Sequence, residues 1–135
     1  MTDAPTTPPP SSDTSFRILA LLGYGLFVLA CTNGFTGIVG VVIAYIKRGE
    51  ARGTIWESHF ANMILVFWSA VAAMVAFFAA VAWGAVTIFA TDPPRTPLNL
   101  IGFGAAIYIA MIAFAVWYLY RTIRGFIRAL DGKAY

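Results

Sequence analysis

The chain has 135 residues, enough for one domain of ordinary size. Hydrophobic residues make up 60% of it and charged residues only 11%, whereas soluble domains are about one quarter charged. Such a composition cannot supply a water-soluble surface, so we expect an all-α integral membrane protein. The single cysteine, Cys31, excludes a disulfide within the chain and a cysteine-rich metal site.

The first fifteen residues, MTDAPTTPPPSSDTS, are rich in proline, serine and threonine and contain no lysine or arginine. A cleavable signal peptide begins with a positively charged region, so we do not expect one here. Proline-rich polar sequence of this kind is typical of disorder. We therefore predict a disordered tail over residues 1–15, a single transmembrane helical bundle over 16–130 and a short C-terminal tail over 131–135.

Three long apolar runs follow the tail, over residues 16–46, 60–90 and 98–120. A bilayer core of about 30 Å needs about 20 helical residues. The third run therefore fits one crossing. The second fits one tilted crossing that projects from the membrane at one end. The first run is as long as the second, but polar residues and glycines interrupt its middle.

This interruption predicts a helix break near residues 32–37. Two geometries are open for the first run: a long, kinked crossing, or a hairpin whose two ends lie on the same side of the membrane. Glycines recur there every three residues, a spacing that lets helix backbones approach closely in a membrane. The residues that we assign to the break and to its packing face are Thr32, Asn33, Gly34, Gly37 and Gly40.

Lysine and arginine gather in the segments 47–52 and 121–133, which hold seven of the nine cations. Cytoplasmic loops of membrane proteins carry such an excess. We therefore expect a multi-pass protein of the bacterial inner (cytoplasmic) membrane with a cytoplasmic C-terminus and the 91–97 loop on the other side. The N-terminus is outside if the first run crosses the membrane, and inside if that run is a hairpin.

The segment after the third run, RTIRGFIRAL, has an amphipathic pattern. Arg121, Arg124 and Arg128 share one helix face, and apolar residues occupy the other. We predict an amphipathic extension of the third helix that lies on the cytoplasmic leaflet and binds anionic lipid headgroups. Because most of the cations flank apolar runs, we expect the lipid bilayer, and no nucleic acid, to be their partner.

The only histidine, His59, follows Glu57 in the motif WESHF. One histidine and one carboxylate are too few for a zinc site, which takes three or four protein ligands. We interpret Glu57 and His59 as interfacial polar residues near a helix start. The chain has no phosphate-binding loop, nucleophile elbow or paired carboxylates, so we expect no catalytic residues, no metal and no cofactor, and not an enzyme.

Three pieces of the sequence, GIVGVVIAYIKR, ESHFANMILVFW and WYLYRTIRGFIRALDGKAY, occur in the order typical of one family. Together they resemble small uncharacterised bacterial membrane proteins of a domain-of-unknown-function family. That family is related to a chloroplast inner-envelope protein-import component of the Tic translocon. The resemblance covers most of residues 16–135 and implies a helical membrane protein, without an agreed activity to transfer.

The resemblance falls on particular positions of this chain, namely Gly40, Ala44, Tyr45, His59, Trp117, Tyr118, Arg121 and Gly125. The chain departs from the family just after His59, where family members are richer in polar residues. This chain has Ala61, Met63, Ile64 and Leu65 there. A polar role for that helix start, which the family would suggest, is therefore weakened.

These observations favour a non-enzymatic inner-membrane protein, an accessory or scaffold subunit of a larger membrane assembly. Its partner would be another membrane protein or a second copy of the chain. The alternative is a minimal transport or translocation component that forms a pore, because interrupted helices are tolerated where protein or water covers the freed backbone.

Overall fold

The computed structural model describes residues 10–90 and 97–135. These residues form four helices and no strand: α1 (Pro10–Asn33), α2 (Phe35–Glu50), α3 (Ile55–Ala90) and α4 (Pro97–Leu130). Three of them, α1, α3 and α4, are long and apolar enough to cross a membrane. The prediction of an all-α membrane-type fold is therefore confirmed. Residues 91–96 of the predicted 91–97 loop and residues 1–9 of the predicted N-terminal tail lie outside the described residues.

The chain forms two compact units, where we expected a single bundle over residues 16–130. Unit 1 comprises residues 1–67 and 121–135, so its described part holds α1, α2, the first part of α3, the last part of α4 and the C-terminal segment. Unit 2 comprises residues 68–120, the remainder of α3 and α4.

Helix α1 begins at Pro10, so the last six residues of the predicted disordered tail, 10–15, lie within it. Proline is well tolerated in the first turn of a helix, where its missing N–H would have no partner. Asp13 lies in the first turn, and a carboxylate there is favoured by the helix dipole. Its side chain also accepts a hydrogen bond from the indole of Trp56. Residues 10–15 are therefore helical, and the disorder prediction for them was wrong.

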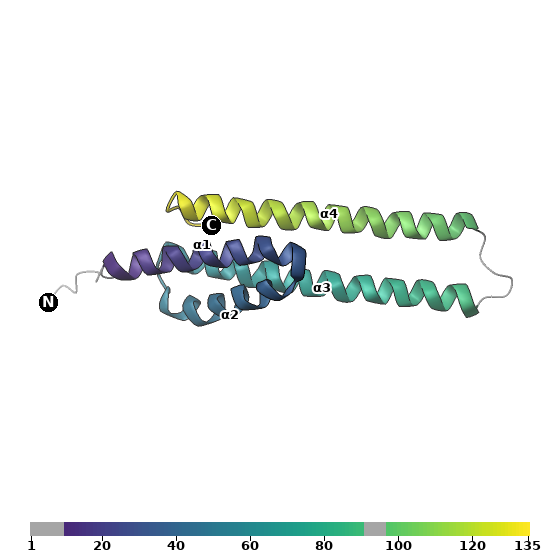
Figure 1. The fold of residues 1–135 in the computed structure, drawn as a ribbon, viewed down its shortest axis with the longest axis horizontal. Helices are drawn as coiled ribbons and strands as arrows, with labels where there is room; N and C mark the ends of the chain where they lie inside the picture. The colour runs from purple at the N-terminus through teal and green to yellow at the C-terminus, as the bar shows by residue number, and fades with distance from the viewer. Residues whose placement is uncertain (1–9, 91–96) are drawn as a thin grey trace. The chain divides into compact units, whose positions relative to one another are not determined.

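The break in the first apolar run is a turn centred on Gly34, whose φ of 68° lies in the left-handed region that favours glycine. The Gly34 N–H still bonds to the Ala30 carbonyl at 2.8 Å, and the chain then reverses. Figure 1 shows α2 returning alongside α1. Of the two geometries left open by the sequence, the structure has the hairpin.

Small residues bring α1 and α2 into close contact. A Cβ added at Gly40 would lie 2.9 Å from the Phe27 ring, and one at Gly37 would lie 3.2 Å from the Ala30 Cβ. Ala44, one turn after Gly40, is fully buried. The hairpin therefore needs small residues along this face of α2, because larger ones would push the helices apart.

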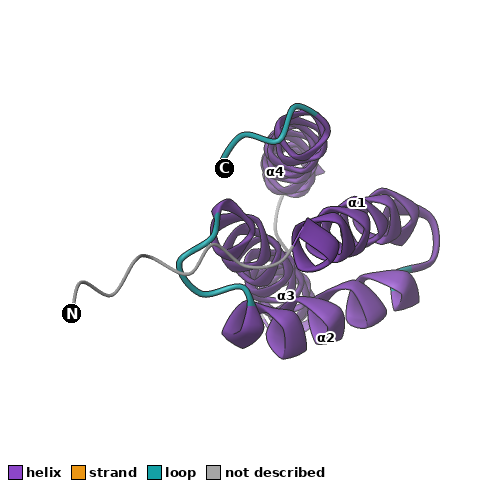
Figure 2. Ribbon diagram, turned by 90° about the vertical axis from the view of Figure 1, so that its left-hand side faces the viewer, coloured by secondary structure: helices purple, strands orange, loops and turns teal. Residues whose placement is uncertain are grey.

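The core of unit 1 is built from apolar stripes at helical spacing. On α1 the stripe is Phe16, Ala20, Tyr24 and Phe27, three or four residues apart. On α3 it consists of Trp56, Phe60, Met63 and Val66. The rings of Phe16 and Phe60 meet edge to face, with centroids 6.5 Å apart. Figure 2 looks along α3, with α1 and α2 running obliquely beside it.

Unit 2 differs in composition and in exposure. Its helical parts, residues 68–90 and 97–120, contain no charged residue. A helix of this length is about 35 Å long, close to the thickness of a bilayer core of about 30 Å. The two parts pack where Gly84 contacts the Phe103 ring. Large apolar side chains elsewhere on them are exposed, among them Trp68, Phe78, Trp83, Ile101, Tyr108 and Val116.

Candidate functional site

Helix α1, the first part of α3 and the last part of α4 meet around His59 in unit 1. The His59 side chain is fully buried. Its Nδ1 lies 3.2 Å from the Tyr24 hydroxyl, and its Nε2 lies 2.8 Å from the Lys133 carbonyl oxygen. The histidine on α3 therefore connects α1 to the segment that follows α4.

The hydrogen bonds continue from Tyr24 to a second buried polar residue, Asn62. The Asn62 amide donates to the Tyr24 hydroxyl at 3.1 Å, and its carbonyl oxygen accepts from the Arg121 Nε at 2.6 Å. We call Tyr24, His59, Asn62 and Arg121 the polar network. It joins three helices through side chains that are far apart in the sequence.

The partners fix the direction of every bond in the polar network. A carbonyl only accepts, so the His59 Nε2 must carry a proton. In the neutral ring, Nδ1 then accepts from the Tyr24 hydroxyl, whose oxygen in turn accepts from Asn62. If Nδ1 were also protonated, the Tyr24 hydroxyl proton would lose this acceptor. The network is therefore complete with a neutral His59 protonated on Nε2.

Aromatic rings enclose His59 on several sides. The Trp56 ring lies 5.5 Å away in a tilted arrangement, and the Tyr135 ring lies 6.3 Å away, edge to face. The guanidinium of Arg121 lies over the Tyr135 ring, 5.3 Å from its centroid. Hydrogen bonds inside such an apolar enclosure are costly to leave unmade, about 1–3 kcal/mol for each unsatisfied group.

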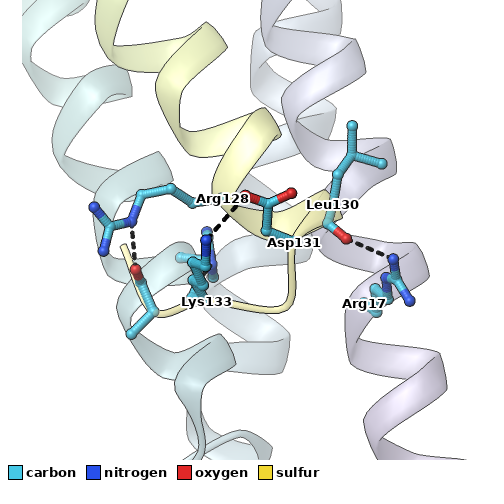
Figure 3. A network of polar contacts seen from close by, with 7 residues as sticks. Arg17, Arg128, Leu130, Asp131 and Lys133 are labelled. Atoms are coloured by element: carbon cyan, nitrogen blue, oxygen red, sulfur yellow. Dashed lines mark hydrogen bonds and ion pairs between the residues drawn. The ribbon is translucent and has the colours of Figure 1, made fainter.

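The segment 131–135 folds back onto the end of α4 and onto α3. Gly132 has a φ of 64°, which reverses the chain. The Lys133 N–H then bonds to the Arg128 carbonyl at 2.9 Å, and the Arg128 Nε donates to the Ala134 carbonyl at 2.6 Å (Figure 3). The Tyr135 N–H donates to the Ser58 hydroxyl at 2.9 Å. This segment is therefore bound as part of unit 1.

The three arginines predicted to face lipid headgroups have different surroundings. Arg121 is half-buried and belongs to the polar network, and Arg128 binds the backbone of the C-terminal segment. Arg124 is exposed. The guanidinium groups of Arg121 and Arg128 are therefore bound to the protein itself.

Glu57, the other predicted interfacial residue, acts at the start of α3. Its carboxylate accepts from the Gly53 N–H at 3.1 Å, and the Thr54 hydroxyl oxygen accepts from the Trp56 N–H at 3.3 Å. These two bonds satisfy backbone donors at the helix start in the manner of a capping box. Glu57 and His59 therefore do not share a site.

The polar residues at the helix break bind the hairpin itself. The Thr36 hydroxyl donates to the Leu26 carbonyl at 2.9 Å, and the Thr32 hydroxyl donates to the Leu29 carbonyl at 2.7 Å. The Asn33 side-chain oxygen accepts from the Thr36 N–H at 3.2 Å. These groups therefore provide partners for backbone atoms at the turn.

Sequence reasoning found His59 but missed Tyr24 and Asn62, its partners. One signal was present: Asn62 lies three residues after His59, so the two side chains share a face of α3. Tyr24 lies in a stripe with Phe16, Ala20 and Phe27, and a buried tyrosine needs a partner for its hydroxyl. The pairing itself depends on how α1, α3 and α4 meet, which no local pattern specifies.

The polar network is suited to holding helices together. His59, Tyr24 and Asn62 are all buried, so a ligand could reach them only if the bundle opened. Within residues 10–90 and 97–135, no cluster of three or more histidine, cysteine, aspartate or glutamate residues could hold a metal ion. The arrangement therefore positions α4 and the segment after it against α1 and α3.

No family model, curated protein or solved structure matches the chain. Its class follows from the fold alone, because the three long apolar helices are compatible with a multi-pass membrane protein.

Proposed function

We propose that this chain is a non-enzymatic subunit, an accessory or scaffold component, of a larger membrane assembly. The observation that carries the proposal is the contrast between inward and outward side chains. The polar network binds unit 1 internally, whereas the helices of unit 2 present large apolar side chains outward. Exposed apolar side chains of this kind suit contact with another membrane protein, which supports a scaffold role.

The surface best suited to such a partner is an apolar groove between α3 and α4 within unit 2. It has a volume of about 580 Å³. Five alanines and six larger apolar side chains line it: Ala70, Ala73, Ala76, Ala110, Ala115, Met74, Phe77, Phe78, Ile107, Met111 and Phe114. Helices associate in membranes through such close packing of small residues. The partner that we propose is an apolar transmembrane helix of another membrane protein.

We further propose the bacterial inner membrane as the location, with the C-terminus in the cytoplasm. The support is that cations gather where α2 ends, where α3 begins and where α4 ends, all within unit 1. The hairpin geometry puts the start of α1 at the same end, since Arg17 binds the Leu130 carbonyl. From Phe35 to Lys47, α2 rises only about 18 Å, too short to cross a core of about 30 Å.

The proposal is tested by site-specific photo-crosslinking in native membranes at native expression. A photoreactive residue at Ala73 or Ala110 faces the groove, whereas one at Tyr108, which is exposed and outside the groove, is the matched control. We expect one recurring crosslinked membrane protein from the groove positions, which co-purifies with the unmodified chain in mild detergent. A chain that is strictly monomeric and partnerless under these conditions would exclude the scaffold role.

The alternative, a pore-forming transport or translocation component, ranks second. The broken first helix motivated this alternative, because a break can line a water-filled path. The polar side chains at the break form hydrogen bonds within the hairpin, which favours the scaffold role. Flux measurements on proteoliposomes distinguish the two roles. Selective permeability of the purified chain would favour the pore, and its absence in every oligomeric form would favour the scaffold.

A further inference from the structure

A second apolar groove runs along the outer side of unit 1, between α1 and the last part of α4. Its volume is about 700 Å³. The residues that line it are Ile18, Leu21, Leu22, Gly25, Leu26, Val28, Leu29, Ile123 and Phe126, all of them apolar. We call it the α1–α4 groove. It is separate from the polar network and from the groove in unit 2.

The length of the α1–α4 groove matches one leaflet of a bilayer. From Ile18 to Leu29 the helix rises about 16 Å. Half of a hydrocarbon core of about 30 Å is about 15 Å. A lipid acyl chain that enters at the Ile18 end would therefore reach the depth of the bilayer midplane near Leu29.

A glycine leaves room in the middle of this groove. A Cβ added at Gly25 would meet no atom within 4 Å, in contrast to Gly23 and Gly40, where a side chain would collide with the core. Gly25 is therefore not required for packing between helices. Because Gly25 has no side chain, it leaves space in the groove beside Leu21 and Leu22.

An arginine stands at the outer end of the groove, next to Ile18. Arg17 is exposed, and its Nη2 donates to the Leu130 carbonyl at 2.6 Å, as Figure 3 shows. A guanidinium has five N–H donors, and within the described residues this is the one hydrogen bond recorded for Arg17. The bond holds the side chain beside α4, where its other donors are available to an anion. Arginine is well suited to phosphate because it can form two parallel bonds.

We propose that the α1–α4 groove binds one acyl chain of an anionic phospholipid, with the lipid phosphate on Arg17. The apolar lining, the length of one leaflet and the Arg17 guanidinium beside Ile18 match the two chemical parts of such a lipid. The positive charge of the Arg17 guanidinium favours an anionic headgroup over a neutral one. This inference does not depend on the proposed scaffold role.

The test is native mass spectrometry of the full chain released from detergent, with added phosphatidylglycerol or phosphatidylcholine. We expect one tightly retained lipid and a preference for phosphatidylglycerol. In Gly25→Leu the new side chain would extend into the groove from a position where a Cβ meets no atom within 4 Å, and loss of contact with even two methylenes weakens binding about tenfold. In Arg17→Gln the preference for phosphatidylglycerol should disappear, and in Arg17→Lys part of it should remain.

Matched controls separate this site from general effects of detergent or charge. Gly104→Leu introduces the same side chain at another open helix position, and Arg52→Gln removes another cation from the same end. Both should retain lipid as the unmodified chain does. Circular dichroism melting establishes that each variant is folded.

Several results would overturn the proposal. One is equal lipid retention by Gly25→Leu and the unmodified chain. Another is an unchanged lipid preference in folded Arg17→Gln. Displacement of phosphatidylglycerol by inorganic phosphate would show an anion site without an acyl-chain groove. A dimer that Gly25→Leu abolishes would show that a second copy of the chain occupies the groove.

Discussion

The same two helices, α3 and α4, run through both units but have different surroundings in each. In unit 1 their residues meet α1, α2 and the C-terminal segment, and they bury Trp56, His59 and Asn62. In unit 2 they carry no charge in the described residues and expose most of their large side chains. A single helix can therefore contribute a specific core over part of its length and an uncommitted apolar surface over the rest.

The largest difference between the units should be in how much the loss of a tryptophan side chain lowers the free energy of unfolding. Trp56 is 1% exposed in unit 1 and Trp83 is 68% exposed in unit 2. Trp56→Ala removes a buried ring and the bond to Asp13, and we expect a loss of about 3–5 kcal/mol in the free energy of unfolding. Trp83→Ala should change it little. Thermal unfolding in mild detergent, followed by circular dichroism, measures both. Equal destabilisation by the two changes would contradict the contrast between the units.

Replacing an asparagine in each unit should give a smaller difference in the free energy of unfolding. Asn62→Leu removes the donor to the Tyr24 hydroxyl and the acceptor for Arg121, and leaves buried polar groups without partners. We expect a cost of about 2–3 kcal/mol in the same unfolding measurement. Asn99→Leu, at an exposed position of unit 2, is the control and should be nearly neutral. If Asn62→Leu proves as stable as the unmodified chain, the polar network does not stabilise unit 1.

The smallest expected effects come from replacing a glycine by alanine in each unit, and these two effects on stability have opposite signs. Gly125 packs directly on the Tyr24 ring, so Gly125→Ala should destabilise unit 1 by about 1–3 kcal/mol through overpacking. Gly102 has open space around it, so Gly102→Ala should stabilise its helix by about 0.5–1 kcal/mol, the usual gain inside a helix. Melting temperatures that shift in opposite directions would support the comparison. Shifts of the same sign would show that the two environments are not distinct.

Much of the fold could be predicted from sequence because it depends on local patterns. The apolar runs gave the long helices, and the glycine and polar residues at 32–37 gave the break. The early start of α1 was not predicted, because a proline- and serine-rich stretch is typical of disorder. The hydrogen bond between Asp13 and Trp56, which ties this stretch to α3, cannot be read from the local sequence. Whether the first run crossed or turned back could not be decided, because either geometry satisfies the same composition.

The polar network was harder to predict than the helices. Its hydrogen bonds join residues 35, 38, 59 and 74 positions apart in the chain. Periodicity shows which residues share a helix face, but it does not show which faces meet. It also placed Arg121 toward lipid, since an arginine beyond an apolar run commonly lies at the membrane interface. In the structure the Arg121 Nε donates to the Asn62 side-chain oxygen, a contact that the pattern did not predict.

The single-residue turn at Gly34 has a consequence for the order of events during synthesis. Contacts between α1 and α2 involve residues close in the chain, and such contacts form fastest. The hairpin can therefore assemble on the ribosome once residue 50 has emerged. The Nε2 of His59 has its acceptor only after residue 133 is made. Nascent chains should accordingly pass through a stage in which the hairpin has formed but the hydrogen bond from His59 to the Lys133 carbonyl has not.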